Sequence, residues 1–228
     1  MLETRLISPE APDYPASAQH LFKTNVQVEQ YNVDVHMYNS STFHKVEVTS
    51  VDSAVGAISD DMASRLLRTI PQDVRKTMQL AERISLAVGG RYEMSLNVNI
   101  ADGLANGAGG VLQKIHLTSA DNSAAGVIWM KFDDAAVVKQ TRIDSQALYK
   151  SGIDASWTPI QPLSRQFQAG SGQSSQVIRK QFPVRQSAAK TIHRCQGDTL
   201  DQVVVDLTSK HKQPHSHYVA LSPVDFSY

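Results

Sequence analysis

The sequence contains a single cysteine, Cys195, among 228 residues, which excludes an internal disulfide framework. It also has no apolar run near the roughly 20 residues that a membrane-spanning helix needs. Its first residues show neither the basic start nor the apolar stretch of a secretory signal. The sequon Asn39-Ser40-Ser41 therefore has no secretory setting. These absences predict an intracellular protein with no membrane contact.

An excess of charge is missing as well, because 22 Lys and Arg residues balance 22 Asp and Glu residues. Nothing in the overall charge indicates a nucleic-acid partner. Basic residues do gather locally at Arg179, Lys180, Arg185, Lys190 and Arg194. Such a cluster can bind phosphate groups in a neutral protein, although the cluster by itself is explained better as a solvated surface. With 41% hydrophobic and 19% charged residues, the chain is typical of a globular protein.

Two motifs of nucleotide chemistry are also absent. No Gly-Lys-Ser or Gly-Lys-Thr occurs, so the chain has no Walker A loop to hold phosphates, and no Asp-Glu pair occurs to hold magnesium. Three histidines, His211, His215 and His217, lie close together, but Pro214 interrupts a helical arrangement and no cysteine or carboxylate joins them. We expect no metal site.

Hydrophobic periodicity divides the chain into three parts. In the first, His20-Leu21-Phe22 is typical of a short strand. The valines of residues 24–37 alternate as in a strand, whereas Thr24 or Asn25 would make a good helix N-cap. Residues 43–51 alternate as a strand. Residues 60–70 are typical of a helix, which Pro71 would end.

The middle part predicts β structure with many turns. Residues 92–100 alternate strictly, and Asp102-Gly103 and Asn106-Gly107 are turn signals. Strands are expected at 111–115 and 127–132, and together these short segments suggest a small barrel. After Pro183 we expect a helix over 187–195 and buried strands over 200–207 and 218–221. These strands need a sheet, and the early strand at Leu21 is their natural neighbour.

The stretch Thr191-Ile192-His193-Arg194-Cys195-Gln196-Gly197-Asp198-Thr199 carries the most chemistry. Thr191 and His193 can hydrogen-bond phosphate oxygens, Arg194 adds charge, and Gly197 lets the backbone approach a phosphate closely. From the residues alone, a polar turn before a buried strand is the favoured explanation. Cys195 has no thiolate-stabilising partner beyond nearby His193, so we do not interpret it as a nucleophile.

This stretch, together with Tyr218-Val219-Ala220-Leu221-Ser222, resembles the last two motifs of superfamily-one DNA helicases of the Pif (petite integration frequency) and RecD type, to which Helitron transposon helicases are similar. The glycine-rich hairpin at residues 96–111 resembles a further block of that family. So does Leu21-Phe22-Lys23-Thr24-Asn25, followed by Val28 and Asn32. The resemblance covers about residues 20–222.

The chain departs from the family pattern at three positions. Arg194 and Cys195 stand where the family usually has lysine and serine. Pro223 stands where the family has the arginine that reaches the ATP γ-phosphate, and proline carries no charge or donor.

The resemblance implies an α/β fold. It would be the second RecA-like (P-loop NTPase-like) lobe with a parallel sheet, interrupted by a small β-barrel insert. The first lobe segment would cover residues 1–78, the insert 79–182 and the second lobe segment 183–228. The implied protein is the C-terminal part of an ATP-dependent DNA helicase that translocates on single-stranded DNA and unwinds duplexes. Its partners would be single-stranded DNA and a first RecA-like lobe that this chain lacks, and its expected location is nuclear.

By the same resemblance, Thr24, Asn25, Thr191, His193 and Arg194 would contact DNA, and Gln196 and Gly197 would face the nucleotide. ATP and magnesium would serve the intact enzyme, and this chain alone would bind neither and hydrolyse nothing. Two other hypotheses stay open: a non-catalytic single-stranded DNA-binding module, and a degenerate transposon-derived relic. The sequence does not choose among repair, recombination, telomere maintenance and transposition.

Overall fold

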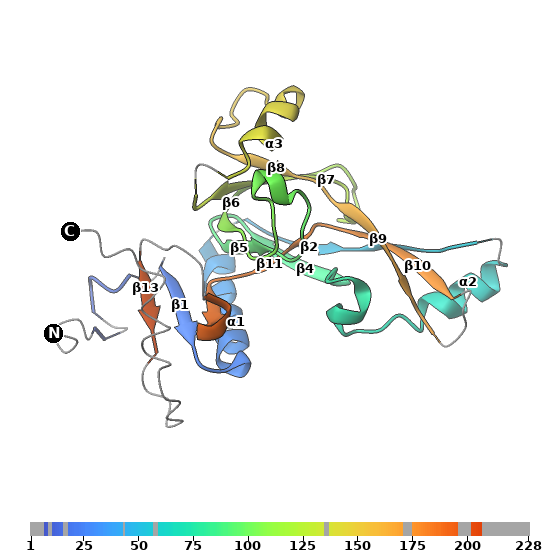
Figure 1. Cartoon of the computed structure of the whole chain (residues 1–228), viewed down its shortest axis with the longest axis horizontal. Helices are drawn as coiled ribbons and strands as arrows, with labels where there is room; N and C mark the ends of the chain where they lie inside the picture. The colour runs from blue at the N-terminus through green and yellow to red at the C-terminus, as the bar shows by residue number, and fades with distance from the viewer. Residues whose placement is uncertain are drawn as a thin grey trace. The chain divides into compact units, whose positions relative to one another are not determined.

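The computed structural model describes residues 7–8, 11–15, 18–42, 44–56, 59–134, 137–170, 175–195 and 202–206. The chain divides into two compact units (Figure 1). The first unit combines residues 1–35 with residues 187–228, and the second holds residues 36–186. No helix in the part of the chain that the structure describes is long and apolar enough to cross a bilayer.

The first unit is built on a three-stranded parallel sheet in the order β12-β1-β13. Its strands are β1 (Gln19–Phe22), β12 (Ala189–Thr191) and β13 (Val203–Val205). Phe22 lies opposite Thr191 in the β1–β12 pair, and Leu21 lies opposite Val205 in the β1–β13 pair. The prediction that the strands at Leu21 and Val203 share one sheet is therefore confirmed.

Different side chains pack against the two faces of this sheet. Leu21 is completely buried and packs with Ile192 and Cys195. The neighbouring residues His20 and Phe22 contact the ring of Tyr31 instead, with ring centroids 4.4 and 5.2 Å apart. Because side chains alternate along a strand, β1 contributes to both sides of the sheet.

Tyr31 belongs to the helix α1 (Asn25–Thr42), which settles the ambiguity at residues 24–37 in favour of a helix. The alternating valines do not form a buried strand face, because Val26 and Val33 are 75% and 54% exposed. The Thr24 hydroxyl accepts a hydrogen bond from the Gln27 N–H, as an N-cap residue does. At these residues the N-cap candidate predicts the helix correctly, whereas the alternation of the valines does not.

The expected helix over residues 187–195 is wrong. Ala189 and Lys190 are paired with β1 in the sheet, and only a short 3-10 turn, η5 (Ile192–Cys195), follows. Pairing with β1 fixes residues 189–191 in an extended conformation, which leaves four residues for the turn.

The second unit contains three antiparallel sheets. The five-stranded sheet has the order β11-β5-β6-β7-β8, formed by β11 (Val184–Gln186), β5 (Arg91–Met94), β6 (Gly109–Leu117), β7 (Gly126–Phe132) and β8 (Thr158–Ile160). The three-stranded sheet comprises β3 (Val51–Ala54), β10 (Gln176–Gln181) and β9 (Leu163–Gln168), and the two-stranded sheet comprises β2 (Lys45–Thr49) and β4 (Arg83–Ala87). Short helical segments are α2 (Asp60–Leu67), η2 (Val74–Thr77), η3 (Ile100–Asp102), α3 (Lys139–Asp144) and η4 (Gln146–Leu148).

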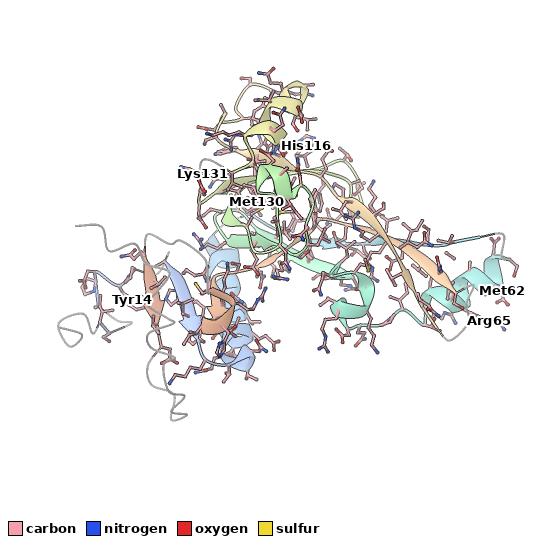
Figure 2. The ribbon with its side chains drawn as sticks, viewed as in Figure 1. Tyr14, Met62, Arg65, His116, Met130 and Lys131 are labelled. Carbon is pink, nitrogen blue, oxygen red and sulfur yellow. The ribbon has the colours of Figure 1, made fainter. Side chains whose placement is uncertain are left out.

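The core of the second unit lies on one face of the five-stranded sheet. It includes the fully buried Leu86, Met94, Leu112, Ile128 and Met130. Along β7, buried Met130 is followed by exposed Lys131, and both are labelled in Figure 2. The chain is thus a mixed α/β protein with a small parallel sheet and separate antiparallel sheets. The closed barrel stays a prediction.

The expected nine-residue strand over 92–100 is wrong beyond Met94. Val98 and Asn99 both donate to the Leu104 carbonyl, and Gly103 and Gly107 have φ angles of 78° and 94° that suit glycine. The loop therefore turns back on itself, and Ile100 is 68% exposed. The two predicted turns are confirmed. Strand β5 ends at Met94, before these turns, although the alternation of residues would continue it to residue 100.

The expected lobe and insert segments, with borders at residues 78 and 182, stay predictions. Residues 36–78 lie in the second unit, where β2 pairs with β4 and β3 pairs with β10. The later border, between residues 186 and 187, lies close to the expected one at 182.

Candidate nucleic-acid interface

The predicted DNA-contact residues of the first unit gather at one edge of the parallel sheet. Thr24 and Asn25 follow β1, and Thr191 ends β12, where it lies opposite Phe22. His193 and Arg194 come next, on η5. Because the strands are parallel, their carboxyl ends meet at the same edge, which is the usual ligand side of an open α/β sheet. Residues far apart in the sequence thus converge.

Thr24 is the N-cap of α1, and its hydroxyl makes two hydrogen bonds with Gln27. The hydroxyl accepts from the Gln27 N–H at 3.3 Å and donates to Gln27 Oε1 at 3.0 Å. Thr24, Asn25 and Val26 are exposed, so the start of the helix faces solvent. The first backbone N–H groups of a helix have no intrahelical partners and attract anions.

The third strand also ends at this edge. The Asp206 N–H donates to the Leu21 carbonyl at 3.0 Å, which continues the β1–β13 ladder by one residue. Asp206 Oδ2 in turn accepts from Gln27 Nε2 at 3.0 Å. Gln27 therefore links the start of α1 to the end of β13.

The η5 turn separates buried from exposed side chains. Ile192 and Cys195 are buried and pack against Leu21, while His193 and Arg194 are exposed. The two apolar residues hold the turn on the sheet, so the two polar residues face outward. The thiol of Cys195 is fully buried among apolar side chains, which is the environment of a structural cysteine.

Asn32 fixes β12 beside α1, and sequence reasoning missed this role. Its Oδ1 accepts from the Ala189 N–H at 2.8 Å, and its Nδ2 donates to the Ala189 carbonyl at 3.4 Å. One side-chain amide thereby satisfies both backbone groups of a residue in the outer strand β12. Only the position of Asn32 in the resemblance drew attention to it.

Sequence reasoning also missed a group of hydrogen-bonded polar atoms around His20 of β1. The buried imidazole of His20 lies 2.9 Å from the Ala18 carbonyl through Nδ1 and 2.8 Å from the Tyr14 hydroxyl through Nε2. Tyr14, labelled in Figure 2, comes from the segment before β1. Burial lowers the pKa of His20 below its ordinary value of 6.5, so the neutral ring is favoured. Nδ1 then donates to Ala18, and Nε2 accepts from Tyr14.

The predicted basic cluster is not a single surface. Arg179 is buried and forms two hydrogen bonds with Asp52, at 2.8 and 2.7 Å. Arg185 pairs with the buried Glu93 at 2.6 Å, and Lys190 is buried in β12. Of the five residues, Arg179 and Lys190 therefore cannot serve as surface contacts for phosphate. Arg194 is the exposed cation at the sheet edge.

Several predicted residues lie outside the described part of the chain: Gln196, Gly197, the block 218–222, Pro223 and the three C-terminal histidines. Their roles stay predictions. Within the described residues, no group of three or more metal-ligating side chains occurs.

The fold of this chain is similar to that of part of the Pif1 helicases. No protein-family model matches the sequence, and no curated protein matches it closely. Solved Pif1 helicase structures do match the fold over most of the chain.

The Pif1 helicase from Candida albicans matches with 21% identity and a TM-score of 0.55, over 96% of this chain and 44% of its own. The Pif1 helicase from Bacteroides in complex with ADP-AlF3 and single-stranded DNA matches with 19% identity and a TM-score of 0.52, over 96% of this chain and 40% of its own. Bacteroides Pif1 bound to single-stranded DNA matches with 18% identity and a TM-score of 0.51, over 91% and 38%. This chain therefore spans less than half the length of these helicases.

Proposed function

We propose that this chain is the C-terminal part of a Pif-type ATP-dependent DNA helicase and that the edge of its parallel sheet binds single-stranded DNA. One observation carries the proposal. Thr24 and the Thr191–His193–Arg194 group, which resemble two separate helicase motifs, follow adjacent parallel strands and meet at their carboxyl ends. The fold likeness to Pif1 helicases that were solved with single-stranded DNA supports it.

The chemistry of this edge suits a DNA backbone. It offers the exposed hydroxyl of Thr24, a helix N-terminus at Asn25, and exposed polar side chains at His193 and Arg194, whereas Thr191 is buried at the end of β12. Such groups contact phosphates and sugars, which are the same at every base, so binding would not depend on sequence. Because the bound phosphates release counterions, the affinity would fall as salt rises.

Nucleotide binding belongs to the proposal only as a role for the intact enzyme. Gln196 and Gly197 would face ATP, which supplies the energy for translocation, and the phosphate-binding loop would come from a first RecA-like lobe. This chain holds no Gly-Lys-Ser or Gly-Lys-Thr for that purpose. We also propose that residues 79–182 form the small barrel of the family.

Fluorescence anisotropy with a labelled oligothymidylate tests the proposal. The parent chain should bind weakly, and more weakly at the higher of two salt concentrations. Replacing His193 and Arg194 together by alanine should lower the affinity roughly tenfold, because each removes a contact to a charged phosphate. Arg65→Ala is the matched control, since Arg65 is an exposed cation on α2 of the other unit (Figure 2). Equal affinities for the parent and the double variant would refute this interface.

A further inference from the structure

The Thr24 hydroxyl, to which the proposed function assigns a DNA phosphate, is already engaged by Gln27. It accepts a hydrogen bond from the Gln27 N–H at 3.3 Å and donates its proton to Gln27 Oε1 at 3.0 Å. A threonine hydroxyl has one proton to donate. A phosphate oxygen can only accept a hydrogen bond, so it must compete with Gln27 Oε1 for that proton.

The orientation of the Gln27 amide follows from its second partner. Its Nε2 lies 3.0 Å from Asp206 Oδ2, and an ionised carboxylate can only accept hydrogen bonds. The NH2 group of Gln27 must therefore face Asp206, which leaves its carbonyl oxygen facing Thr24. Asp206 is itself fixed, because its N–H donates to the Leu21 carbonyl of β1.

We propose that Gln27 is a gate on the DNA-binding edge, held closed by Asp206. A phosphate of the incoming strand takes the Thr24 proton, and the Gln27 carboxamide swings away from Thr24. The Gln27 N–H remains on the Thr24 oxygen, so the cap of α1 survives the exchange. This inference rests on the proposed function, and it assigns Gln27 a positioning role that neither Thr24 nor the η5 residues share.

The gate lowers the resting affinity for single-stranded DNA. Binding must break one ordinary side-chain hydrogen bond, whose net contribution corresponds to a factor of about 2 to 10 in an equilibrium constant. Removing the Gln27 amide should therefore tighten binding by that factor. A residue that simply contacted DNA, or that only supported the fold, would weaken binding when removed.

The experiment measures oligothymidylate affinity of the full chain for four forms: the parent, Gln27→Met, Thr24→Val and the double variant. Methionine keeps the length of the side chain and removes both amide groups. We expect Gln27→Met to bind about 2- to 10-fold more tightly than the parent. In the Thr24→Val background the same change should have no effect, because there is no hydroxyl to release. Gln27→Ala repeats the test if methionine packs poorly, and thermal unfolding of each variant checks that α1 is intact.

Two results overturn the gate while leaving the proposed function standing. One is a parent that binds in a salt-dependent way together with Gln27 variants that bind equally or more weakly. The other is tightening that persists in the Thr24→Val background. A parent chain that binds no oligothymidylate overturns the proposed function and the gate together.

Discussion

Arginine residues of this protein occupy two different electrostatic environments. Arg179 is buried, and its guanidinium forms a two-point contact with Asp52 and donates to the Leu80 carbonyl at 3.1 Å. Arg65 forms an ion pair with Asp61 on α2, where both side chains are more than two-thirds exposed. Water screens the exposed pair, whereas removing one partner of the buried pair leaves an uncompensated charge.

Asp52→Ala should therefore destabilise the protein by about 3–5 kcal/mol, the usual effect of breaking a buried ion pair. Asp61→Ala should change the free energy of unfolding by less than about 1 kcal/mol, as expected of an exposed pair. Urea unfolding of both variants and the parent measures the difference. Similar losses for the two variants would show that Arg179 does not depend on Asp52.

His20 predicts a pH dependence. Burial lowers its pKa below 6.5, so the unfolded chain takes up the proton at a higher pH than the folded chain. The stabilising contribution is complete above pH 6.5 and is lost as the pH falls through the folded-state pKa. Urea midpoints between pH 8 and 5 should fall less in His20→Asn than in the parent. His44→Gln is the control, because His44 is exposed, and its profile should follow the parent. Parallel profiles for the parent and His20→Asn would contradict the prediction.

At the scale of helices and strands, sequence patterns predicted an element correctly where interactions between neighbouring residues determine it. The strand at Leu21 and the start of the helix at Asp60 were predicted, where Asp60 and Asp61 suit a helix N-terminus and Ser59 caps it, but the helix ends at Leu67 and not at the expected residue 70. The alternation at residues 92–100 failed because turn geometry at Gly103 and Gly107 overrides it. The helix expected over 187–195 failed because the chain pairs with β1, a partner distant in the sequence.

The candidate site could likewise be predicted only where local sequence patterns determine it. Its residue types and order could be predicted from the motifs, and Thr24 could be recognised as a cap. The contacts of Asn32 with Ala189 and of Gln27 with Asp206 join distant segments, so no local pattern reveals them.

Asn32→Ala should loosen β12 from α1. The change leaves the Ala189 N–H without its side-chain acceptor, which costs about 1–3 kcal/mol for a buried group. Gln30→Ala on the same helix is the control. Gln30 is exposed and donates only to Asp34, so its loss should stay within about 0.5 kcal/mol. Amide hydrogen exchange should show faster exchange at residues 189–191 in Asn32→Ala. Unchanged protection there would contradict this role.

At the scale of the whole molecule, the chain carries one sheet edge with helicase-like motifs but no phosphate-binding loop of its own. We therefore predict no ATP hydrolysis by the purified chain, with or without single-stranded DNA. The physical reason is the absence of Gly-Lys-Ser or Gly-Lys-Thr to hold the phosphates. A coupled ATPase assay checks this. DNA-stimulated turnover on the order of 1 s⁻¹, a low value for an enzyme, would contradict it.

The parallel sheet joins the two ends of the described chain, so β1 is synthesised long before either of the strands that pair with it. Gln19 donates to the Ala188 carbonyl across 169 positions, and β13 follows later still. On a ribosome adding 5–20 residues each second, β1 would wait roughly 10–40 s for its partners. The second unit is itself completed only by β11, just before β12 begins, and Leu21 and the unpaired edges of β1 stay exposed until then. Nascent chains of this protein should therefore depend on chaperones until β12 and β13 have been synthesised.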